Sequence, residues 1–275
     1  MKKMLITGSS GFISKNLIEF YSNIYEITEQ NRSIPINDAL QTNPDLIINC
    51  AASIYEEDSM FDSNVILVNT LLNYVKKNNN TRMIQIGSSA EYGRKSHATK
   101  ETDYLDPTTI YEATKCAATM LCVGYARSYD LSIAVARPYS VYGKYEKSYR
   151  LFHKLYNAFV KNEPMDLYNG FHDFIYIKDF IKGIDTLLHA DHHKMKGDVV
   201  NFGSGKQYSN FEILDIFKTT LNRDPNIIIH NDMRKCFEST TWVCDTTYAE
   251  QKYKFKCDYD MKSGIIDFIK EKEKL

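Results

Sequence analysis

The chain has 275 residues, of which 43% are hydrophobic, and its 34 basic residues nearly balance its 35 acidic ones. This apolar fraction is large enough to bury a core, which excludes a disordered chain. The balanced charge provides no field that would attract nucleic acid or an anionic membrane surface. We therefore expect no nucleic-acid or membrane partner, and a local pocket for any anionic ligand.

The first residues show no leader pattern, because Lys2 and Lys3 run straight into the short apolar segment 4–6. No later window approaches the length of roughly 18 apolar residues that a membrane-spanning helix needs. The six cysteines form no C-x-x-C pair, so the sequence predicts neither a metal site nor a disulfide framework. These features predict a cytoplasmic protein.

In the first half of the chain, short apolar runs alternate with longer amphipathic stretches. The expected strands and the helices between them are 4–6, 16–25, 46–50, 64–77, 82–86, 111–129 and 131–136. Parallel neighbouring strands need crossover connections, which are usually helices. The alternation therefore predicts the α/β class, with a doubly wound parallel sheet covered by helices on both faces.

The pattern loosens after Pro138, where helix-like stretches at 148–161 and 177–189 flank a turn at Asn169-Gly170. No linker or low-complexity segment separates the two halves. We expect residues 1–145 to form the domain built on this sheet, which the motifs below make the dinucleotide-binding domain. Residues 146–275 are expected to form mainly a smaller lobe, which would bind the substrate, with some segments returning to the sheet.

The glycines Gly8 and Gly11 lie between the first strand and the first helix, and Ser14 stands where a third glycine is common. Glycine lets the backbone turn sharply and approach a pyrophosphate, whose charge then lies at the positive end of the helix. The pair alone is equally consistent with a turn that binds nothing.

The second strand is expected to end near Asn31 and Arg32, where a dinucleotide site meets the adenosine ribose. An arginine at this corner would pair with a 2′-phosphate, which favours NADP(H). Glu29 could instead accept hydrogen bonds from the ribose and serve NAD(H), and Arg32 could be a solvated loop charge. The sequence thus favours NADP(H) and leaves NAD(H) possible.

Two further patterns indicate chemistry at the sheet edge. Tyr111 and Lys115 lie four residues apart, so they share a helix face, and a nearby ammonium would favour the phenolate. Ser88 follows a strand and could donate to a substrate oxygen. With 20 tyrosines in the chain, each pattern is weak alone.

The order and spacing of these motifs resemble extended short-chain dehydrogenase/reductases of the NAD-dependent epimerase/dehydratase family, which act on nucleotide sugars. The resemblance covers nearly the whole chain, through "LITGSSGFI", "PDLIINCAAS", "IGSSAEYG", "YEATK", "ARPYSVYGK", "HDFIYIKDF", "VNFGSG" and "DTTYAEQKYKF". It implies a Rossmann domain that binds the cofactor, with a nucleotide sugar as the substrate.

The resemblance also implies roles for individual residues. Ser88, Tyr111 and Lys115 would form the catalytic triad. Besides Tyr111 and Lys115, the cofactor would contact Gly8, Ser10, Gly11, Phe12, Ile13, Asn31, Arg32, Asp38, Ala51 and Ala52. The substrate would contact Ser89, Ala90, Tyr139, Ser140, His172 and Arg234.

The substrate set departs from the family pattern at two positions. Ser140 replaces the usual asparagine, and His172 replaces an arginine that meets the nucleotide diphosphate. A neutral imidazole binds phosphate more weakly than a guanidinium group does. Arg234 and Arg150 are candidate replacements, and a surface position would explain either of them equally well.

The residues after Ser88 narrow the reaction. Dehydratases of the family carry an acid pair there, whereas this chain has Ser89 and Ala90, although Glu91 is close enough to leave elimination open. Members that combine 3,5-epimerisation with reduction commonly have a cysteine at the position of Ala90 and a downstream histidine, for which His153 is a candidate. Reduction of a 4-keto group and 4-epimerisation need only the triad and the cofactor.

The short region between the glycine turn and "PDLIINCAA" resembles small 4-ketoreductases of deoxysugar pathways. The sequence therefore favours NADPH-dependent reduction of a nucleotide-linked 4-keto-6-deoxysugar over an NAD-dependent nucleotide-sugar 4-epimerase, with a 4,6-dehydratase less favoured still. The intact triad argues against a cofactor-sensing scaffold. The family often forms homodimers through two helices per subunit, and Ala113, Ala117 and Ala118 would allow close packing there or against the sheet.

Overall fold

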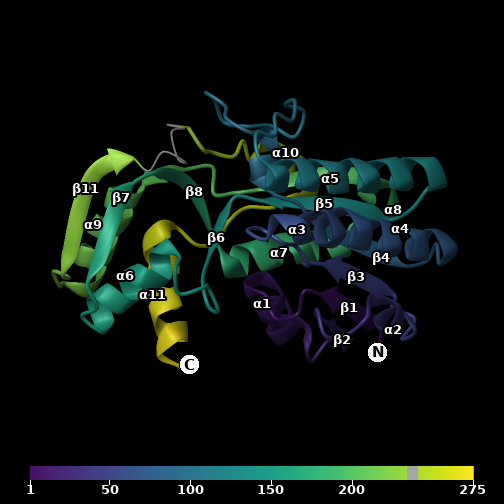
Figure 1. Cartoon of the computed structure of the whole chain (residues 1–275), viewed down its shortest axis with the longest axis horizontal. Coiled ribbons are helices and arrows are strands. Elements are labelled where there is room, and N and C mark those ends of the chain that lie inside the picture. Colours follow the sequence, from purple (N-terminus) through teal and green to yellow (C-terminus); the bar gives the residue numbers. More distant parts are fainter. Residues whose placement is uncertain (234–240, 275) are drawn as a thin grey trace.

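The computed structural model describes residues 1–233 and 241–274 (Figure 1). Six strands form a wholly parallel sheet in the order β2-β1-β3-β4-β5-β9. Their bounds are β1 (Lys3–Thr7), β2 (Glu26–Gln30), β3 (Leu46–Asn49), β4 (Arg82–Ile86), β5 (Ile133–Pro138) and β9 (Lys196–Phe202). The doubly wound parallel sheet expected from the sequence is confirmed.

Helices cover both faces of this sheet. The helices of this part are α1 (Phe12–Tyr21), α2 (Ile36–Leu40), α3 (Glu57–Phe61), α4 (Leu67–Lys77), α5 (Ile110–Tyr129), α7 (Ile177–Leu188), α8 (His192–Met195) and α10 (Thr247–Tyr253). A π-helical turn, η1 (Asp62–Ile66), joins α3 to α4, and a 3₁₀ turn, η2 (Ser89–Tyr92), follows β4.

Side-chain alternation along the strands explains the two faces. Met4 and Ile6 of β1 belong to the apolar cluster that includes α1 and α7, whereas Leu5 belongs to the cluster beneath α4 and α5. Each strand is therefore apolar on both sides, which is why it appears in the sequence as a continuous apolar run. Helix α1 begins at Phe12 rather than near Asn16, because Gly11 is its N-cap.

The second half of the chain forms a lobe beside the sheet (Figure 1). Its elements are β6 (Ser140–Tyr142), α6 (Leu151–Val160), β7 (Met165–Asn169), β8 (Phe171–Tyr176), β10 (Gln207–Ser209), α9 (Asn210–Leu221), β11 (Ile227–Met233) and α11 (Met261–Glu273). Strands β10, β8 and β6 form one small sheet, and β11 pairs with β7. Aromatic rings from β6, β8, α6, α9 and α11 fill the lobe core.

The lobe is interleaved with the sheet rather than appended to it. Strand β9 pairs with β5, and α7 packs on β4 and β5. Chain segments that lie far apart in sequence therefore meet at the carboxyl ends of the parallel strands. In open α/β sheets, ligands bind at this edge.

Candidate active site

The turn after β1 is shaped for close approach of a ligand. Gly8 has a φ of 62°, and a Cβ atom on it would lie 2.8 Å from the Ala51 Cα. The Gly11 N–H donates to the Gly8 carbonyl at 2.8 Å. Ser14 is buried, and its Oγ donates to the carbonyls of Gly8 and Gly11. A serine at the third position therefore closes the turn by hydrogen bonds.

Helix α1 starts directly from this turn, and no side chain caps it, since its N-cap is Gly11. The first backbone N–H groups of a helix have no partner within it, and they carry the positive end of the helix dipole. Ser10 is exposed in the turn, whereas Phe12 and Ile13 are half-buried against the core. The uncapped helix and the cradle that a Cβ at Gly8 would fill suit a dinucleotide pyrophosphate.

Replacing Gly8 by Ala should strain this turn, because an L-residue at positive φ costs about 1–3 kcal/mol and the new methyl would overlap Ala51. We expect a lower melting temperature and at least about a tenfold loss of dinucleotide affinity in calorimetry. Gly124→Ala is the matched control, since a Cβ there meets no atom within 4 Å. Unchanged affinity in Gly8→Ala would contradict the role of the turn.

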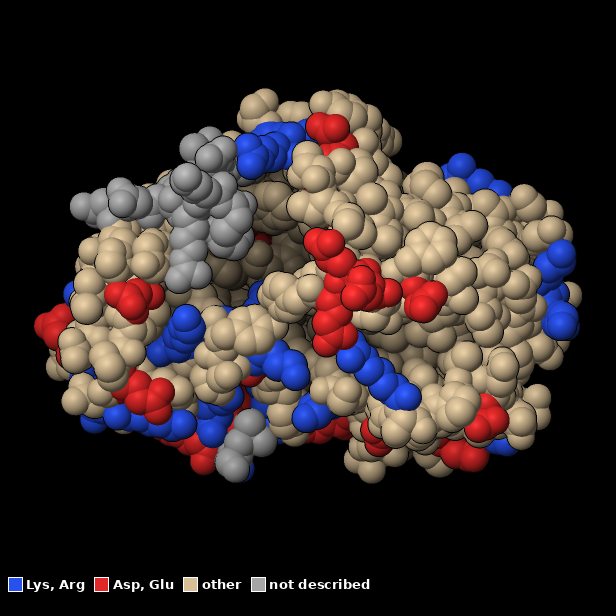
Figure 2. Space-filling view, viewed as in Figure 1, with Lys and Arg blue, Asp and Glu red and all other residues tan. Residues whose placement is uncertain are grey.

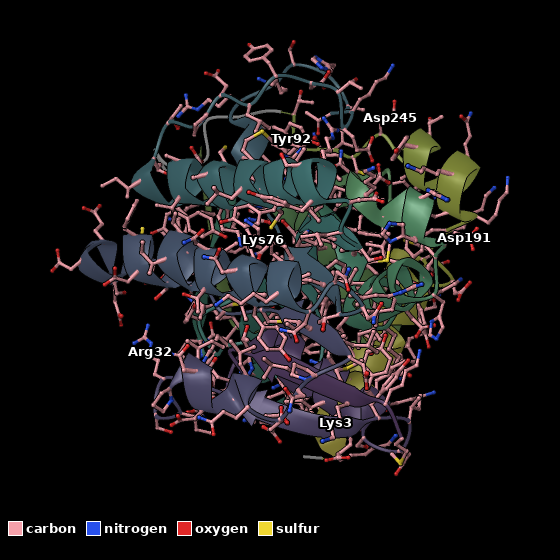
Figure 3. The ribbon with its side chains drawn as sticks, turned by 90° about the vertical axis from the view of Figure 1, so that its right-hand side faces the viewer. Lys3, Arg32, Lys76, Tyr92, Asp191 and Asp245 are labelled. Carbon is pink, nitrogen blue, oxygen red and sulfur yellow. The ribbon has the colours of Figure 1, made fainter. Side chains whose placement is uncertain are left out.

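The corner beyond β2 holds the predicted ribose contacts. Asn31 Oδ1 accepts hydrogen bonds from the backbone N–H and the hydroxyl of Ser33. Arg32 projects outward (Figure 3), and its Nη2 lies 2.9 Å from Glu56 Oε2. Asp38 is exposed in the first turn of α2. Arg32 is thus neither an isolated loop charge nor free of an anionic partner.

The loop after β3 lines the other side of the glycine turn. The Ala51 N–H donates to Thr7 Oγ1 at 3.3 Å, whereas Ala52 is exposed. Further along, the ring of Tyr55 lies 6.1 Å from that of Tyr149, which precedes α6. The loop therefore touches both β1 and the chain leading into the lobe.

The predicted triad is assembled at the ends of β4 and α5. The Ser88 side chain lies close enough to the Tyr111 phenol to act on its pKa. Burial raises the pKa of Tyr111 above its ordinary value, Ser88 lowers it, and the Glu91 charge raises it. The positive charge of Arg150 also lowers the pKa of Tyr111.

Lys115, one helical turn after Tyr111 on α5, reaches the end of β4, where its Nζ donates to the Ile86 carbonyl at 2.5 Å. It is almost fully buried, and burial lowers its pKa while the Glu91 and Cys50 charges raise it. Lys115 thus places an ammonium group at this strand end, near Cys50 at the start of the loop after β3.

A buried ion pair beneath the triad was missed by the sequence reasoning. Arg137 Nη2 lies 2.7 Å from Glu91 Oε2, and both side chains are almost inaccessible. The other carboxylate oxygen, Oε1, accepts the Ser88 N–H at 2.8 Å. Arg137 also donates to the Tyr92 hydroxyl at 2.9 Å. Both carboxylate oxygens of Glu91 are therefore hydrogen-bonded, one to the Arg137 guanidinium and the other to the Ser88 backbone, which fixes the turn at Ser88.

The signal for this pair was present in the sequence. An arginine in the apolar run that forms β5 must be buried, and buried charges are paired. Glu91, the acid nearest the serine motif, was its natural partner. The sequence leaves Glu91 open as an acid for elimination, and its bonds to Arg137 and Ser88 argue against that role.

Part of the predicted substrate set comes together where β6 and β8 pair. Ser140 Oγ lies 3.3 Å from His172 Nδ1. Burial lowers the pKa of His172 to about 4, and the Arg150 charge adds to the effect. The imidazole is therefore neutral near pH 7. Arg150, at the start of α6, lowers the pKa of both His172 and Tyr111. Its guanidinium therefore lies close enough to act on a residue of the lobe and on a residue at the sheet edge.

Ser89 and Tyr139 line one small cavity of about 10 Å³ with Lys95, His97 and Trp242. Tyr139 is buried, and its hydroxyl hydrogen-bonds to Thr99. Ala90 is half-exposed in η2. Arg234 lies outside the described residues.

His153, the candidate for a second proton-transfer residue, lies on α6, with its Nδ1 3.0 Å from Lys272 Nζ. This pairing is with the C-terminal helix rather than with the triad. Within the described ranges, no group of three or more His, Cys, Asp or Glu side chains is arranged to hold a metal ion. The search of the same ranges finds no helix with the length and hydropathy of a membrane span.

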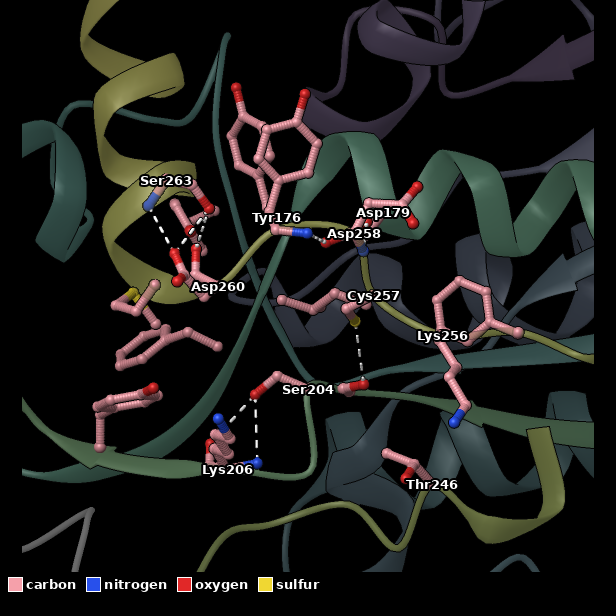
Figure 4. A pocket seen from close by; sticks show the side chains of 18 of the residues that line it. Tyr176, Asp179, Ser204, Lys206, Thr246, Lys256, Cys257, Asp258, Asp260 and Ser263 are labelled. Carbon is pink, nitrogen blue, oxygen red and sulfur yellow. Dashed lines mark hydrogen bonds between the residues drawn. The ribbon is translucent and has the colours of Figure 1, made fainter. Parts of the chain in front are cut away.

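A separate cavity of about 410 Å³ lies between the loop 203–206 and the chain entering α11 (Figure 4). Its lining includes Asp179, Lys206 and Asp260, and none of the triad residues. Figure 2 shows a different hollow, between the lobe and the sheet domain, with acidic side chains gathered over the start of α3. We assign the reacting centre to the strand ends, because the glycine turn and the triad meet there.

The parallel sheet, the glycine turn and the Ser-Tyr-Lys set define a dinucleotide-binding protein of the short-chain dehydrogenase/reductase class. The family model of the NAD-dependent epimerase/dehydratase family matches residues 4–203. The chain belongs to this family, as the resemblance of its motifs implied.

Individual relatives agree with this placement. An uncharacterised UDP-glucose epimerase of Bacillus subtilis, YtcB, is 25% identical over 209 residues, which are 75% of this chain and 65% of that protein. The chain thus spans about two thirds of that relative's length.

Solved structures share the fold. A dTDP-glucose 4,6-dehydratase from Bacillus anthracis in complex with NAD has a TM-score of 0.87 at 22% identity, covering 100% of this chain and 97% of that one. RMD from Pseudomonas aeruginosa complexed with NADPH has a TM-score of 0.84 at 18% identity, covering 100% and 99%. Proteins of this fold therefore include both NAD and NADPH binders.

Proposed function

We propose that the chain catalyses NAD(P)-dependent hydride transfer at C4 of a nucleotide-linked sugar. The observation that carries the proposal is that Ser88, Tyr111 and Lys115 all lie at the end of β4, where Ser88 acts on the pKa of the Tyr111 phenol and Lys115 Nζ donates to the Ile86 carbonyl. The uncapped start of α1 and the Gly8 cradle would hold the pyrophosphate, and Lys115 the ribose. When bound, the cofactor supplies or accepts the hydride.

The residues of the chain would manage the proton. Tyr111 would exchange a proton with the C4 oxygen of the sugar, and the Ser88 hydroxyl would hydrogen-bond the same oxygen as its charge develops. Arg150 and the neutral pair Ser140–His172 would face the diphosphate and sugar from the lobe. A guanidinium at Arg150 supplies the cation that His172 does not.

Two reactions need only these groups. One is the NADPH-dependent reduction of a 4-keto-6-deoxysugar, which Arg32 at the ribose corner favours. The other is NAD-dependent 4-epimerisation, in which the hydride is removed and returned, and which the pairing of Arg32 with Glu56 favours. Neither needs the additional acid pair of a dehydratase, and Ser89 and Ala90 supply none.

Turnover with defined substrates tests the proposal. The purified chain should either oxidise NADPH with a nucleotide 4-keto-6-deoxysugar or, with NAD, interconvert the 4-epimers of a UDP- or dTDP-hexose. Absorbance at the nicotinamide band follows the first reaction, and chromatography of the sugar nucleotides follows the second. Failure of both, with dinucleotide bound, would favour a cofactor-sensing scaffold and overturn the catalytic proposal.

A homodimer through the outer faces of α4 and α5 is also consistent with the structure. On α5, Ile110 and Met120 are exposed large apolar residues, and Ala113 between them is exposed as well. Ala117 is half-buried, and Ala118 packs against the sheet. Small residues on an exposed apolar helix face allow a second copy to approach closely.

A further inference from the structure

The glycine turn after β1 is flanked by two loops. In the sheet order, β2 lies on one side of β1 and β3 on the other. The Ser9 N–H donates to the Gln30 carbonyl at the end of β2, and a Cβ on Gly8 would touch Ala51 after β3. A dinucleotide seated on the turn would therefore have the loop 31–34 on one side and the loop 51–56 on the other.

The β2 side of this corner presents amides and a cation. The Gln30 amide donates to the carbonyls of Asn31 and Ile34, so it is committed to its own turn. The Asn31 carbonyl oxygen of the side chain is committed to Ser33. Arg32 then supplies the positive charge. No carboxylate follows β2 at Asn31 or Arg32, where an NAD site usually places one.

The β3 side supplies that carboxylate. Glu56 Oε2 lies 2.9 Å from Arg32 Nη2, so the ion pair spans the end of β1 from one loop to the other. The loop that carries Glu56 is held by its neighbours, because Ser53 Oγ and Ser59 Oγ both donate to the Glu56 carbonyl. Ser59 Oγ also lies 3.3 Å from Glu56 Oε2. These bonds hold the Glu56 backbone, while its carboxylate is held by Arg32 and Ser59.

The two cofactors differ at this corner by one group. A ribose 2′-hydroxyl is a donor that a carboxylate can accept, whereas a 2′-phosphate carries about −1.5 to −2 charges near pH 7. The phosphate would have to displace Glu56 from Arg32 and would then lie beside the released carboxylate. That pair is exposed on both sides, so the repulsion, more than the cost of opening the pair, would decide the outcome.

We propose that Glu56 is the residue that selects the cofactor. Its carboxylate would accept a hydrogen bond from the adenosine ribose 2′-hydroxyl and neutralise Arg32, so that the chain prefers NAD(H) over NADP(H). This inference rests on the proposed function only in that a dinucleotide binds at the glycine turn. It gives Arg32 the opposite effect from the one its sequence position suggests, because its charge is already matched within the protein.

Calorimetric titration of the intact chain with NAD and with NADP tests the proposal without any turnover. The native chain should bind NAD more tightly than NADP, by about tenfold or more, as expected for one added like-charge contact. Glu56→Gln should bring this ratio close to one or reverse it, mainly through a gain in NADP affinity. Added salt should shrink the native preference, because both side chains are exposed.

Two matched variants separate Glu56 from its surroundings. Glu57→Gln removes the adjacent exposed charge, and Glu29→Gln removes the exposed acid on β2; both should leave the ratio within about twofold. Arg32→Gln added to Glu56→Gln should reduce the NADP gain without abolishing it, because the released guanidinium adds to the effect of removing the repulsion.

The outcomes distinguish this inference from the proposed function. A native preference for NADP, an unchanged ratio in Glu56→Gln, or a shift in Glu29→Gln as large as that in Glu56→Gln would each overturn the assignment to Glu56. Absence of binding by either dinucleotide in a folded native chain would overturn the proposed function itself.

Discussion

Replacing Tyr111 by Phe should lower kcat by about 10²–10⁴-fold, the usual contribution of a positioned acid/base, while the chain stays folded. The Tyr111 hydroxyl lies beside Ser88, and Phe lacks this hydroxyl, which is the group placed to move a proton at C4. Stopped-flow or steady-state kinetics with the sugar nucleotide that the turnover assay selects gives kcat. Thermal melting and cofactor titration report whether the fold and the cofactor site survive.

The Phe ring should occupy the place of the Tyr111 ring at little cost in stability. Phe keeps the apolar contacts of Tyr111, and Ser88 Oγ still accepts the Ala90 N–H. We therefore expect a melting temperature within a few degrees of the native value and a dinucleotide affinity within about twofold. A Ser88→Ala variant should lose less than Tyr111→Phe, because the serine only hydrogen-bonds the oxygen. A Tyr111→Phe chain with near-native kcat would remove the triad from the mechanism.

The raised pKa of Tyr111 adds a pH dependence to the oxidative direction. Burial keeps the phenol protonated beyond its ordinary range, so the fraction able to accept a proton should increase as pH rises. Glu91 raises this pKa further, whereas Ser88 and Arg150 lower it. A rate of sugar oxidation that increases toward alkaline pH in the native chain, with the increase lost in Tyr111→Phe, is the expected profile.

Much of the fold could be predicted because each strand of a parallel sheet is buried on both faces. The runs 4–6, 46–50 and 82–86 have no competing amphipathic interpretation, whereas the first helix begins at Phe12, four residues before its expected start. The interruption of the helix at η1 was not predicted. There the Asn64 side chain bonds to the backbone of Ser53 and to Thr114, three segments whose proximity exists only in the folded chain.

The candidate site was predictable in its groups and less so in their partners. Spacing alone singles out Ser88, Tyr111 and Lys115 only weakly, and the family resemblance supplies their roles. The partner of Arg32 does not follow from the sequence, because Glu56 reaches it across β1 from a loop that has no sequence relation to β2. The same holds for Arg150, whose charge acts on Tyr111 and His172 although it begins a helix of the lobe. In both cases the partners come from segments that are far apart in sequence and meet only in the folded chain.

The largest expected effect on stability comes from the pair beneath the triad. Glu91→Gln should destabilise the fold by about 3–5 kcal/mol, because it leaves the buried Arg137 guanidinium without its counter-charge. At this chain length the loss corresponds to a fall in melting temperature on the order of 10 °C. Calorimetric melting measures it, and Glu57→Gln is the exposed control, which should change stability by less than about 0.5 kcal/mol.

Removing both charges should restore much of that stability. A Glu91→Met, Arg137→Met variant replaces the ion pair with apolar groups of similar length, a change that is often neutral or stabilising in buried sites. Its activity should nevertheless stay low, because Glu91 Oε1 no longer accepts the Ser88 N–H and the serine turn loses its support. A single Glu91→Gln chain that melts within 2 °C of the native chain (less than about 1 kcal/mol) would contradict the buried pair. Full activity in the double variant would instead confine the pair to stability and separate it from the position of Ser88.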